Sequence, residues 1–254
     1  MSSIKLSKKI LRAAGKANAR YRLIEDGDRV IVGLSGGKDS LTLVHLLKYM
    51  QRHAPFSFTF KALTVNYGMP GESYEALSRH CEEHEIEHEV YKTNIFEVAQ
   101  DTIRENSSFC SYFSRMRRGA LYTKAAEGGY NKVALGHHLD DAAESFFMNM
   151  LYNGTMRSMP PIYRSDKGFH VIRPLIWVRE RQTAAFAEEN AIETIGDEAC
   201  PAMAMRVKMP HARESTKKML QEWEEREPDL FKRFRAAFCH LQPASFMDEG
   251  FLKR

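Results

Sequence analysis

The sequence of 254 residues predicts a doubly wound α/β domain with a mostly parallel sheet and helical additions at both ends. Residues 28–34 (DRVIVGL) form a continuous apolar run rich in β-branched side chains, which is typical of a strand buried on both faces. Strand-like and helix-like segments then alternate along the chain, which predicts βαβ units joined by right-handed crossovers. From about residue 179 the pattern becomes mainly helical.

The elements can be placed in order. A basic amphipathic helix is expected within residues 1–22, which carry seven Lys or Arg and no acid. Strands are expected at 28–34, 58–67, 87–95, 132–138 and, as a weaker candidate, 170–176. Helices are expected at 40–51, 73–85 and 140–154. We therefore expect three parts: the N-terminal helix (1–22), a nucleotide-binding α/β domain (23–178) and a helical C-terminal region (179–254).

Composition excludes several classes of protein. Apolar residues make up 43% of the chain and aromatic residues 11%, which is too much for a disordered protein. No apolar run approaches the ~18 residues of a membrane span, and the first residues lack the apolar run of a secretory signal. The four cysteines are too few and too scattered for a disulfide scaffold. We expect a cytoplasmic globular protein that does not contact membranes.

A glycine-rich loop joins the first strand of the domain to its helix, with the sequence Ser35-Gly36-Gly37-Lys38-Asp39-Ser40. Ligands bind open α/β sheets at this kind of strand end. Two glycines let the backbone turn sharply, and successive N–H groups with the helix N-terminus form a cradle for an anion. The serines add hydroxyls, Lys38 adds a positive charge, and Asp39 is a candidate ligand of Mg²⁺. The loop predicts a phosphate site, with an ordinary glycine turn as the alternative.

The loop matches neither G-x-x-x-x-G-K-[ST] nor G-x-G-x-x-G. SGGKDS instead resembles the loop of the PP-loop (ATP-pyrophosphatase) family, whose fold is the adenine nucleotide alpha hydrolase-like one. The resemblance implies ATP cleavage between the α and β phosphates and transfer of AMP to a substrate oxygen. Residues 110–122, 132–152, 159–161 and 171–175 further resemble the TtcA-type proteins, which use ATP and a sulfur donor to form 2-thiocytidine in tRNA. This resemblance extends from about residue 10 to residue 245.

More nucleotide contacts are expected at two other strand ends. The end of the strand at 132–138 and the start of the next helix carry candidates for ATP binding: Gly136, His137, Asp140 and Asp141. Asp140 is a candidate Mg²⁺ ligand together with Asp39, although the two aspartates could simply cap the next helix. Val65, in the stretch that ends the second strand, is expected to border the adenosine, with plain strand packing as the alternative.

The cysteines depart from the family pattern. The resemblance implies two C-x-x-C pairs that supply thiolates to a [4Fe–4S] cluster. Here Phe113 occupies the second position of the pair that begins at Cys110, and Met203 occupies that of the pair that begins at Cys200. Phenylalanine cannot ligate iron, and methionine is a poor substitute for a thiolate in such clusters. These departures argue against the cluster.

A persulfide route replaces the cluster in our interpretation. Cys110 is expected to carry the persulfide, and Cys200 to resolve it by forming a disulfide with Cys110. Cations lower the pKa of a thiol and so favour the reactive thiolate. The arginines that follow Cys110 are expected to do this and to contact RNA: Arg115, Arg117 and Arg118. Asp39 completes the expected catalytic set.

The expected partners are a nucleic acid substrate and a sulfur donor such as a cysteine desulfurase. The basic stretch at 1–22 and another at 206–218 suit a tRNA backbone, whose contacts give affinity without reading sequence. Two alternatives stay open: thionation of a small nucleobase such as guanine, and a nucleotide-binding protein that has lost catalysis. The resemblance also suggests a homodimer.

A further pattern begins on the helix expected at 73–85, where Cys81-x-x-His84-x-x-x-His88 has spacing that resembles a zinc site. We expect no zinc there, because the segment is acidic and offers no fourth ligand nearby. Cys239 is expected to serve packing.

Overall fold

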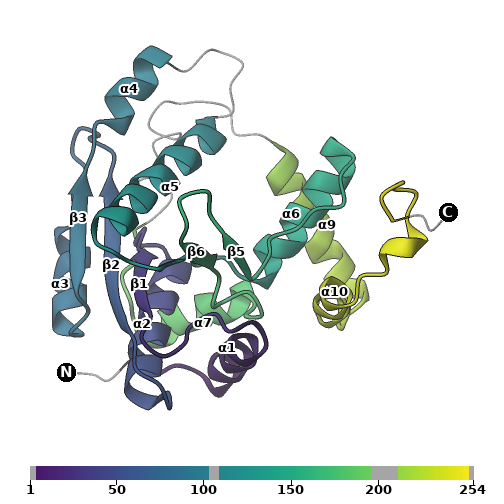
Figure 1. The fold of residues 1–254 in the computed structure, drawn as a ribbon, viewed down its shortest axis with the longest axis horizontal. Coiled ribbons are helices and arrows are strands. Elements are labelled where there is room, and N and C mark those ends of the chain that lie inside the picture. Colours follow the sequence, from purple (N-terminus) through teal and green to yellow (C-terminus); the bar gives the residue numbers. More distant parts are fainter. Residues whose placement is uncertain (1–3, 103–108, 196–210, 252–254) are drawn as a thin grey trace. The chain divides into compact units, whose positions relative to one another are not determined.

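The structure, a computed structural model, describes residues 4–102, 109–195 and 211–251. These residues include a sheet with the strand order β3-β2-β1-β4-β6-β5 (Figure 1). The strands are β1 (Arg29–Gly33), β2 (Thr59–Asn66), β3 (His88–Lys92), β4 (Lys132–Ala134), β5 (Ile162–Arg164) and β6 (His170–Ile172). All neighbours pair in parallel except β5 and β6, which are antiparallel. The predicted mostly parallel sheet is confirmed, and β5 is an edge strand that the sequence pattern did not reveal.

The described helices surround this sheet or form a separate cluster. They are α1 (Lys8–Tyr21), α2 (Lys38–His53), α3 (Glu75–Glu83), α4 (Ile95–Thr102), α5 (Phe109–Glu127), α6 (Leu139–Asn153), α7 (Glu180–Glu189), α9 (His211–Arg226) and α10 (Leu230–Cys239), followed by a 3₁₀ turn at Pro243–Ser245. None of the helices in the described ranges is long and apolar enough to cross a membrane.

The chain divides into two compact units. Unit 1 comprises Met1–His138 and Met159–Pro210, and it contains the sheet with α1 to α5 and α7. Unit 2 comprises Leu139–Ser158 and His211–Arg254, and it contains α6, α9 and α10. The division into three parts expected from the sequence stays a prediction.

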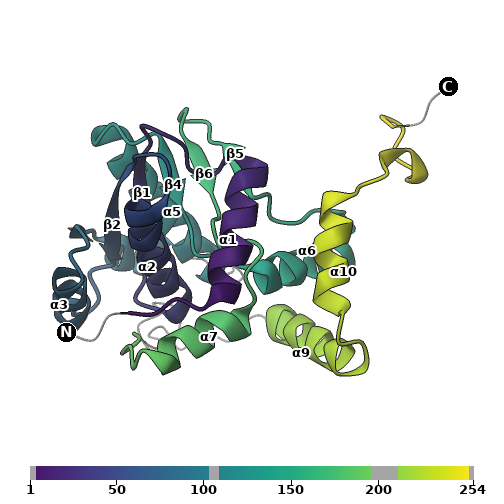
Figure 2. The same ribbon diagram turned by 90° about the horizontal axis from the view of Figure 1, so that it is seen from below.

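The position of β1 in the sheet accounts for its continuous apolar sequence. Val30, Ile31 and Val32 are all buried, although their side chains alternate between the two faces of the sheet. Ile31 packs with Leu63 and Val133 under α5, in a core cluster that also takes Leu121 from that helix. The opposite face is covered by α2 and α7, which lie across the sheet from α5 (Figures 1 and 2). A strand between two helical layers has no solvated side, so its sequence shows no polar alternation.

The N-terminal helix is amphipathic, as predicted. Ser7 caps α1 by accepting a hydrogen bond from the backbone N–H of Ile10, and the helix ends at Arg22, which adopts the left-handed conformation (φ 51°). Its buried face carries Ile10, Ala14 and Ala17. The basic side chains Lys8, Lys9, Arg12, Lys16 and Arg20 are exposed.

Unit 2 has its own apolar core. Leu139, Ala143 and Phe147 on α6 pack against Leu220 on α9 and Phe231 on α10. Further aromatic rings extend the cluster, with Phe147 5.3 Å from Phe234 and 5.4 Å from Trp223 between ring centroids. The mainly helical pattern expected after residue 179 is therefore present, with α7 in unit 1 and the later helices in unit 2.

Candidate nucleotide site

The topology of unit 1 marks the position of a ligand site. From β1 the chain proceeds outward through β2 to β3, whereas β4 pairs with the other side of β1 and leads to β6. The direction of winding therefore reverses between β1 and β4. Open α/β sheets bind ligands beyond the carboxyl ends of the strands at such a switch point. The predicted phosphate loop, residues 35–40, begins there.

The hydroxyl of Ser40 holds the loop together. Its oxygen accepts a hydrogen bond from the backbone N–H of Ser35 (3.2 Å) and lies 3.2 Å from the Ser35 hydroxyl. It donates to the carbonyl oxygen of Gly37 at 2.9 Å. Gly37 is the N-cap of α2, and no side chain caps this helix end. Backbone N–H groups at an uncapped helix start are the donors that a bound phosphate uses.

Both the backbone conformation and the neighbouring side chain require glycine at position 36. Its φ of +84° lies in the left-handed region, which favours glycine. A Cβ atom there would lie 2.5 Å from Cδ1 of Ile195. The backbone N–H of Ile195 also donates to the carbonyl oxygen of Gly36 at 3.0 Å. The segment after α7 therefore packs directly on the loop.

Two acidic groups and a hydroxyl position the charged residues of the loop. Nζ of Lys38 lies 3.2 Å from Oδ2 of Asp39 and 3.2 Å from Oε1 of Glu180 on α7. Thr183, one helical turn further along α7, donates its hydroxyl to Oδ1 of Asp39. Burial alone would lower the pKa of Lys38, but the carboxylates of Asp39 and Glu180 outweigh it and raise that pKa. Lys38 is therefore a cation at neutral pH.

The carboxyl end of β4 approaches the same loop. A Cβ atom on Gly136 would lie 3.2 Å from the backbone of Asp39 and Ser40, so glycine permits this approach. His138 is buried, and its Nε2 lies 3.7 Å from Oδ1 of Asp39. Gly136 and His138 thus lie against the loop, and the expected contact of Gly136 with ATP stays a prediction. The neighbouring His137 follows Gly136 in the chain, and its contact with ATP stays a prediction.

Asp140 and Asp141 begin unit 2 on the first turn of α6. Both are buried. Asp141 accepts a hydrogen bond from Arg213 of α9 at 2.6 Å, and the same guanidinium donates to Glu144 at 3.0 Å. This ion pair shows a structural use for Asp141 within unit 2. Their expected roles in ATP and Mg²⁺ binding stay predictions.

The second strand end contains Val65 and Asn66. The side chain of Val65 belongs to the core cluster under α5, so its contact with adenosine would have to come from the backbone. Asn66 lines an open hollow of about 440 Å³ together with Glu72, Tyr74 and Lys92. A volume of that size lies in the range of small-molecule sites.

The predicted sulfur-transfer residues are only partly described. Arg115, Arg117 and Arg118 lie on α5, where Arg115 is exposed and stacks over the ring of Tyr112 at 5.9 Å. The Nε–H of Arg118 donates to the carbonyl oxygen of Ser114. Cys110 is part of α5, but its side chain lies outside the described residues, as do Cys200 and Met203.

Phe113 is described in full. It is buried, and its ring packs against Tyr67 with centroids 5.9 Å apart, in a cluster that includes Ala99. The position at which the family pattern has its second cysteine therefore belongs to an apolar core in this chain.

Sequence reasoning missed Glu180, Thr183 and Ile195. These residues follow the loop by more than a hundred positions and carry no motif, and only the packing of α7 against α2 brings them to it. The positions of the loop and of Gly136 at the ends of strands could be predicted because their sequence carries a local signal, and their contacts with ATP stay predictions.

Comparison with known proteins agrees with this geometry. Residues 5–205 match the family model described as "PP-loop domain". The "tRNA-cytidine(32) 2-sulfurtransferase" of Geobacter metallireducens is 38% identical over 95% of this chain and 93% of its own length. The protein of the same name from Pseudomonas syringae is 38% identical over 97% of this chain and 88% of its own. Among solved structures, the U34-tRNA thiolase NcsA from Methanococcus maripaludis, determined with its [4Fe–4S] cluster, superposes with a TM-score of 0.71 at 23% identity, covering 93% of this chain and 80% of that one.

Proposed function

Because the chain belongs to the PP-loop domain family, in the branch of the tRNA-cytidine(32) 2-sulfurtransferases, we propose that it uses ATP to convert cytidine 32 of tRNA to 2-thiocytidine. The observation that carries the proposal is the loop at the switch point of the sheet. There the uncapped start of α2, a cationic Lys38 and the approach of Gly136 meet around Asp39.

The first step is adenylation. The N–H groups of residues 36–40 would bind the β and γ phosphates of ATP, and Lys38 would turn from Glu180 toward them. The O2 oxygen of the cytidine attacks the α-phosphorus, the bond to the bridging oxygen breaks, and pyrophosphate leaves. Lys38 offsets the negative charge that grows on the leaving group. Asp39 would hold Mg²⁺, which neutralises phosphate charge when bound, and a role of Asp140 in binding Mg²⁺ stays a prediction.

The second step replaces oxygen with sulfur. A sulfur donor such as a cysteine desulfurase first leaves a persulfide on Cys110. Its terminal sulfur attacks C2 of the base and displaces AMP, which leaves the base joined to Cys110 through a disulfide. The Cys200 thiolate then attacks the Cys110 sulfur and releases the 2-thiocarbonyl base, with its electron pair, from a new Cys110–Cys200 disulfide. An external dithiol reduces that disulfide before the next turnover.

This chain does not fit an iron–sulfur cluster of the usual family pattern. Phe113 lies in the apolar core beside Tyr67 and has no atom that ligates iron. Met203 replaces the other thiol. Only Cys110 and Cys200 are left from the two pairs, so the route above uses thiols alone. A homodimer, expected from the resemblance, stays a prediction.

The test measures AMP and pyrophosphate release with Mg·ATP, a persulfide donor and a dithiol, and 2-thiocytidine in digested tRNA by mass spectrometry. We expect release to depend on a tRNA with cytidine at position 32 and to disappear with uridine there. Lys38→Ala should slow release at least about 100-fold, the effect of losing one electrostatic donor, while Lys124→Ala on α5 should not. Release driven by a free nucleobase instead of tRNA would make the substrate a small molecule. If neither tRNA nor a free nucleobase causes release, the chain would be a nucleotide-binding protein that has lost catalysis.

A further inference from the structure

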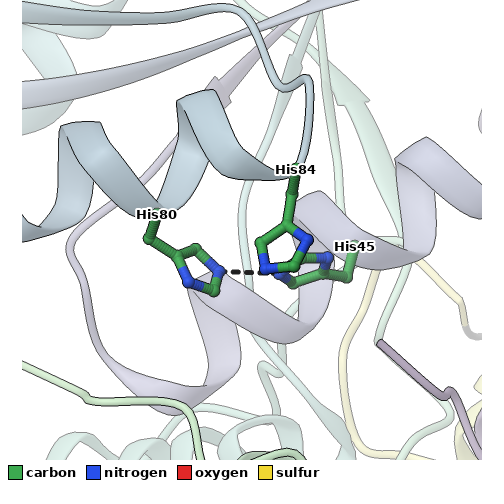
Figure 3. A group of neighbouring side chains, drawn as sticks. All are labelled: His45, His80 and His84. Atoms are coloured by element: carbon green, nitrogen blue, oxygen red, sulfur yellow. Dashed lines mark hydrogen bonds between the residues drawn. The ribbon is translucent and has the colours of Figure 1, made fainter. Parts of the chain in front are cut away.

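Three histidines converge in unit 1 (Figure 3). His45 lies on α2, His80 lies on α3, and His84 is the residue that ends α3. His80 and His84 are four positions apart, so the helix places both imidazoles on one face. His45 approaches that face from the neighbouring helix. We refer to these three residues as the histidine cluster.

The distances within the cluster are those of a ligand set. Nε2 of His45 and Nε2 of His80 are 2.8 Å apart, and one ring nitrogen from each of the three histidines lies within 4.8 Å of the others. The ring centroids are 4.6 to 5.1 Å apart. A tetrahedral metal ion with metal–nitrogen bonds of about 2.0–2.1 Å needs its nitrogens roughly 3.3 Å apart. Small side-chain rotations would bring all three nitrogens to that separation.

The environment favours neutral imidazoles, which are the form that binds metal. His45 is 5% exposed, and burial together with His80 and His84 lowers its pKa to about 3. Burial and His84 also lower the pKa of His80, against a smaller opposing effect of Glu83. His80 and His84 are partly exposed, which leaves a path for an ion from solvent.

The zinc-like spacing in the sequence differs from this set. Cys81 is fully buried, and burial raises the pKa of its thiol to about 12, so it is not a thiolate. His88 points to other partners, with its ring nitrogens 2.8 Å from the Thr64 hydroxyl and 3.3 Å from the Ser78 hydroxyl. Of the three residues in that spacing, only His84 joins the histidine cluster.

We propose that His45, His80 and His84 bind a divalent transition-metal ion, with Zn²⁺ as the expected ion and water as its fourth ligand. Three histidines and an open position form a known zinc arrangement. The ion would join α2, which starts at the phosphate loop, to α3. Binding to the folded state alone stabilises it by mass action, so the bound ion would raise the melting temperature of the protein.

The experiment uses the full chain without a polyhistidine tag, freed of metal by a chelator, and without ATP or tRNA. Titration calorimetry with Zn²⁺ should show one site per chain and a rise in melting temperature. Co²⁺ should give the visible bands of a tetrahedral ion without the sulfur-to-cobalt charge transfer of a cysteine site. His84→Gln and His80→Gln should weaken binding by at least about 10- to 100-fold, since even indirect partners of a metal cost that much.

His53→Gln is the matched control, because His53 lies on the same helix as His45 but is exposed and bonds to the carbonyl oxygen of Tyr49. It should bind Zn²⁺ as the unaltered protein does. Binding that survives in both His80→Gln and His84→Gln, a thiolate spectrum with Co²⁺, or no binding at all would each overturn the proposal. None of these outcomes bears on sulfur transfer, which is measured separately.

Discussion

Gly36 and Gly37 are neighbours in the loop, but their backbones impose different requirements. Gly36 has φ +84° and faces the side chain of Ile195, whereas Gly37 has φ −75° and only an ordinary contact at 3.7 Å. Gly36→Ala should therefore lower the free energy of unfolding by about 2 kcal/mol, the cost of a strained residue, and displace the segment at Ile195. Gly37→Ala should change it by less than about 1 kcal/mol. Urea unfolding of both variants measures this, and equal losses would contradict the geometry.

Thr183 is a positioning residue for Asp39. Its hydroxyl lies within hydrogen-bond distance of Oδ1 of Asp39 and of the Glu180 carbonyl oxygen, and the residue is completely buried. Thr183→Val keeps the shape of the side chain and removes the hydroxyl that orients Asp39. The loss of that hydrogen bond should cost about 1.4 kcal/mol, which is a tenfold loss of activity with ATP. We expect that loss in kcat/KM for ATP and recovery in Thr183→Ser. If the serine variant is as slow as the valine variant, the hydroxyl is not responsible.

Among the elements, α6 and α9 share an apolar core and are also joined by one guanidinium. Arg213 bonds to Asp141 and to Glu144, whose side chains are 11% and 6% exposed. Because Arg213 itself is 63% exposed, its loss should cost about 1–3 kcal/mol rather than the full penalty of a buried charge. Arg213→Met should thus increase hydrogen exchange in α6 and α9, while Lys218→Met on the exposed side of α9 should not.

The loss of stability caused by Arg213→Met should depend on pH because of Glu144. Burial raises the pKa of Glu144, although Arg213 opposes the rise. Removing Arg213 should raise this pKa further. An ionised Glu144 lowers the free energy of unfolding at pH values above its pKa in the folded protein. This loss shrinks as the pH falls through that pKa toward the lower pKa of Glu144 in the unfolded chain. The destabilisation by Arg213→Met should therefore be smaller at pH 5 than at pH 8, and the reverse order in denaturant melts would contradict this cause.

The elements also show what the sequence could predict. β1 and the loop were predictable because a buried run and a compact glycine motif are local signals. β5 was missed because it forms the edge of the sheet, where its residues are half-buried or exposed and leave no apolar run in the sequence. The partners of the loop on α7 and the histidine cluster could not be predicted, since both depend on which helices pack together after folding. For the same reason, the spacing of Cys81, His84 and His88 could not show that His84 lies beside His45 and His80.

At the scale of the whole molecule, the departure of Phe113 and Met203 from the family pattern separates two kinds of sulfur chemistry. A three-thiolate cluster cannot form at these two pairs, so the protein purified without oxygen should hold less than stoichiometric iron and acid-labile sulfide. It should still thiolate tRNA when given a persulfide donor and a dithiol. Cys110→Ser should abolish thiolation and AMP release while a single turnover of pyrophosphate release continues, because the second step, which displaces AMP, needs that sulfur. Cys239→Ser, which changes a partly buried cysteine of α10, should leave both steps intact. About four irons per chain with matching sulfide would return the sulfur-transfer step to a cluster, and thiolation that survives Cys110→Ser would rule out the persulfide on Cys110.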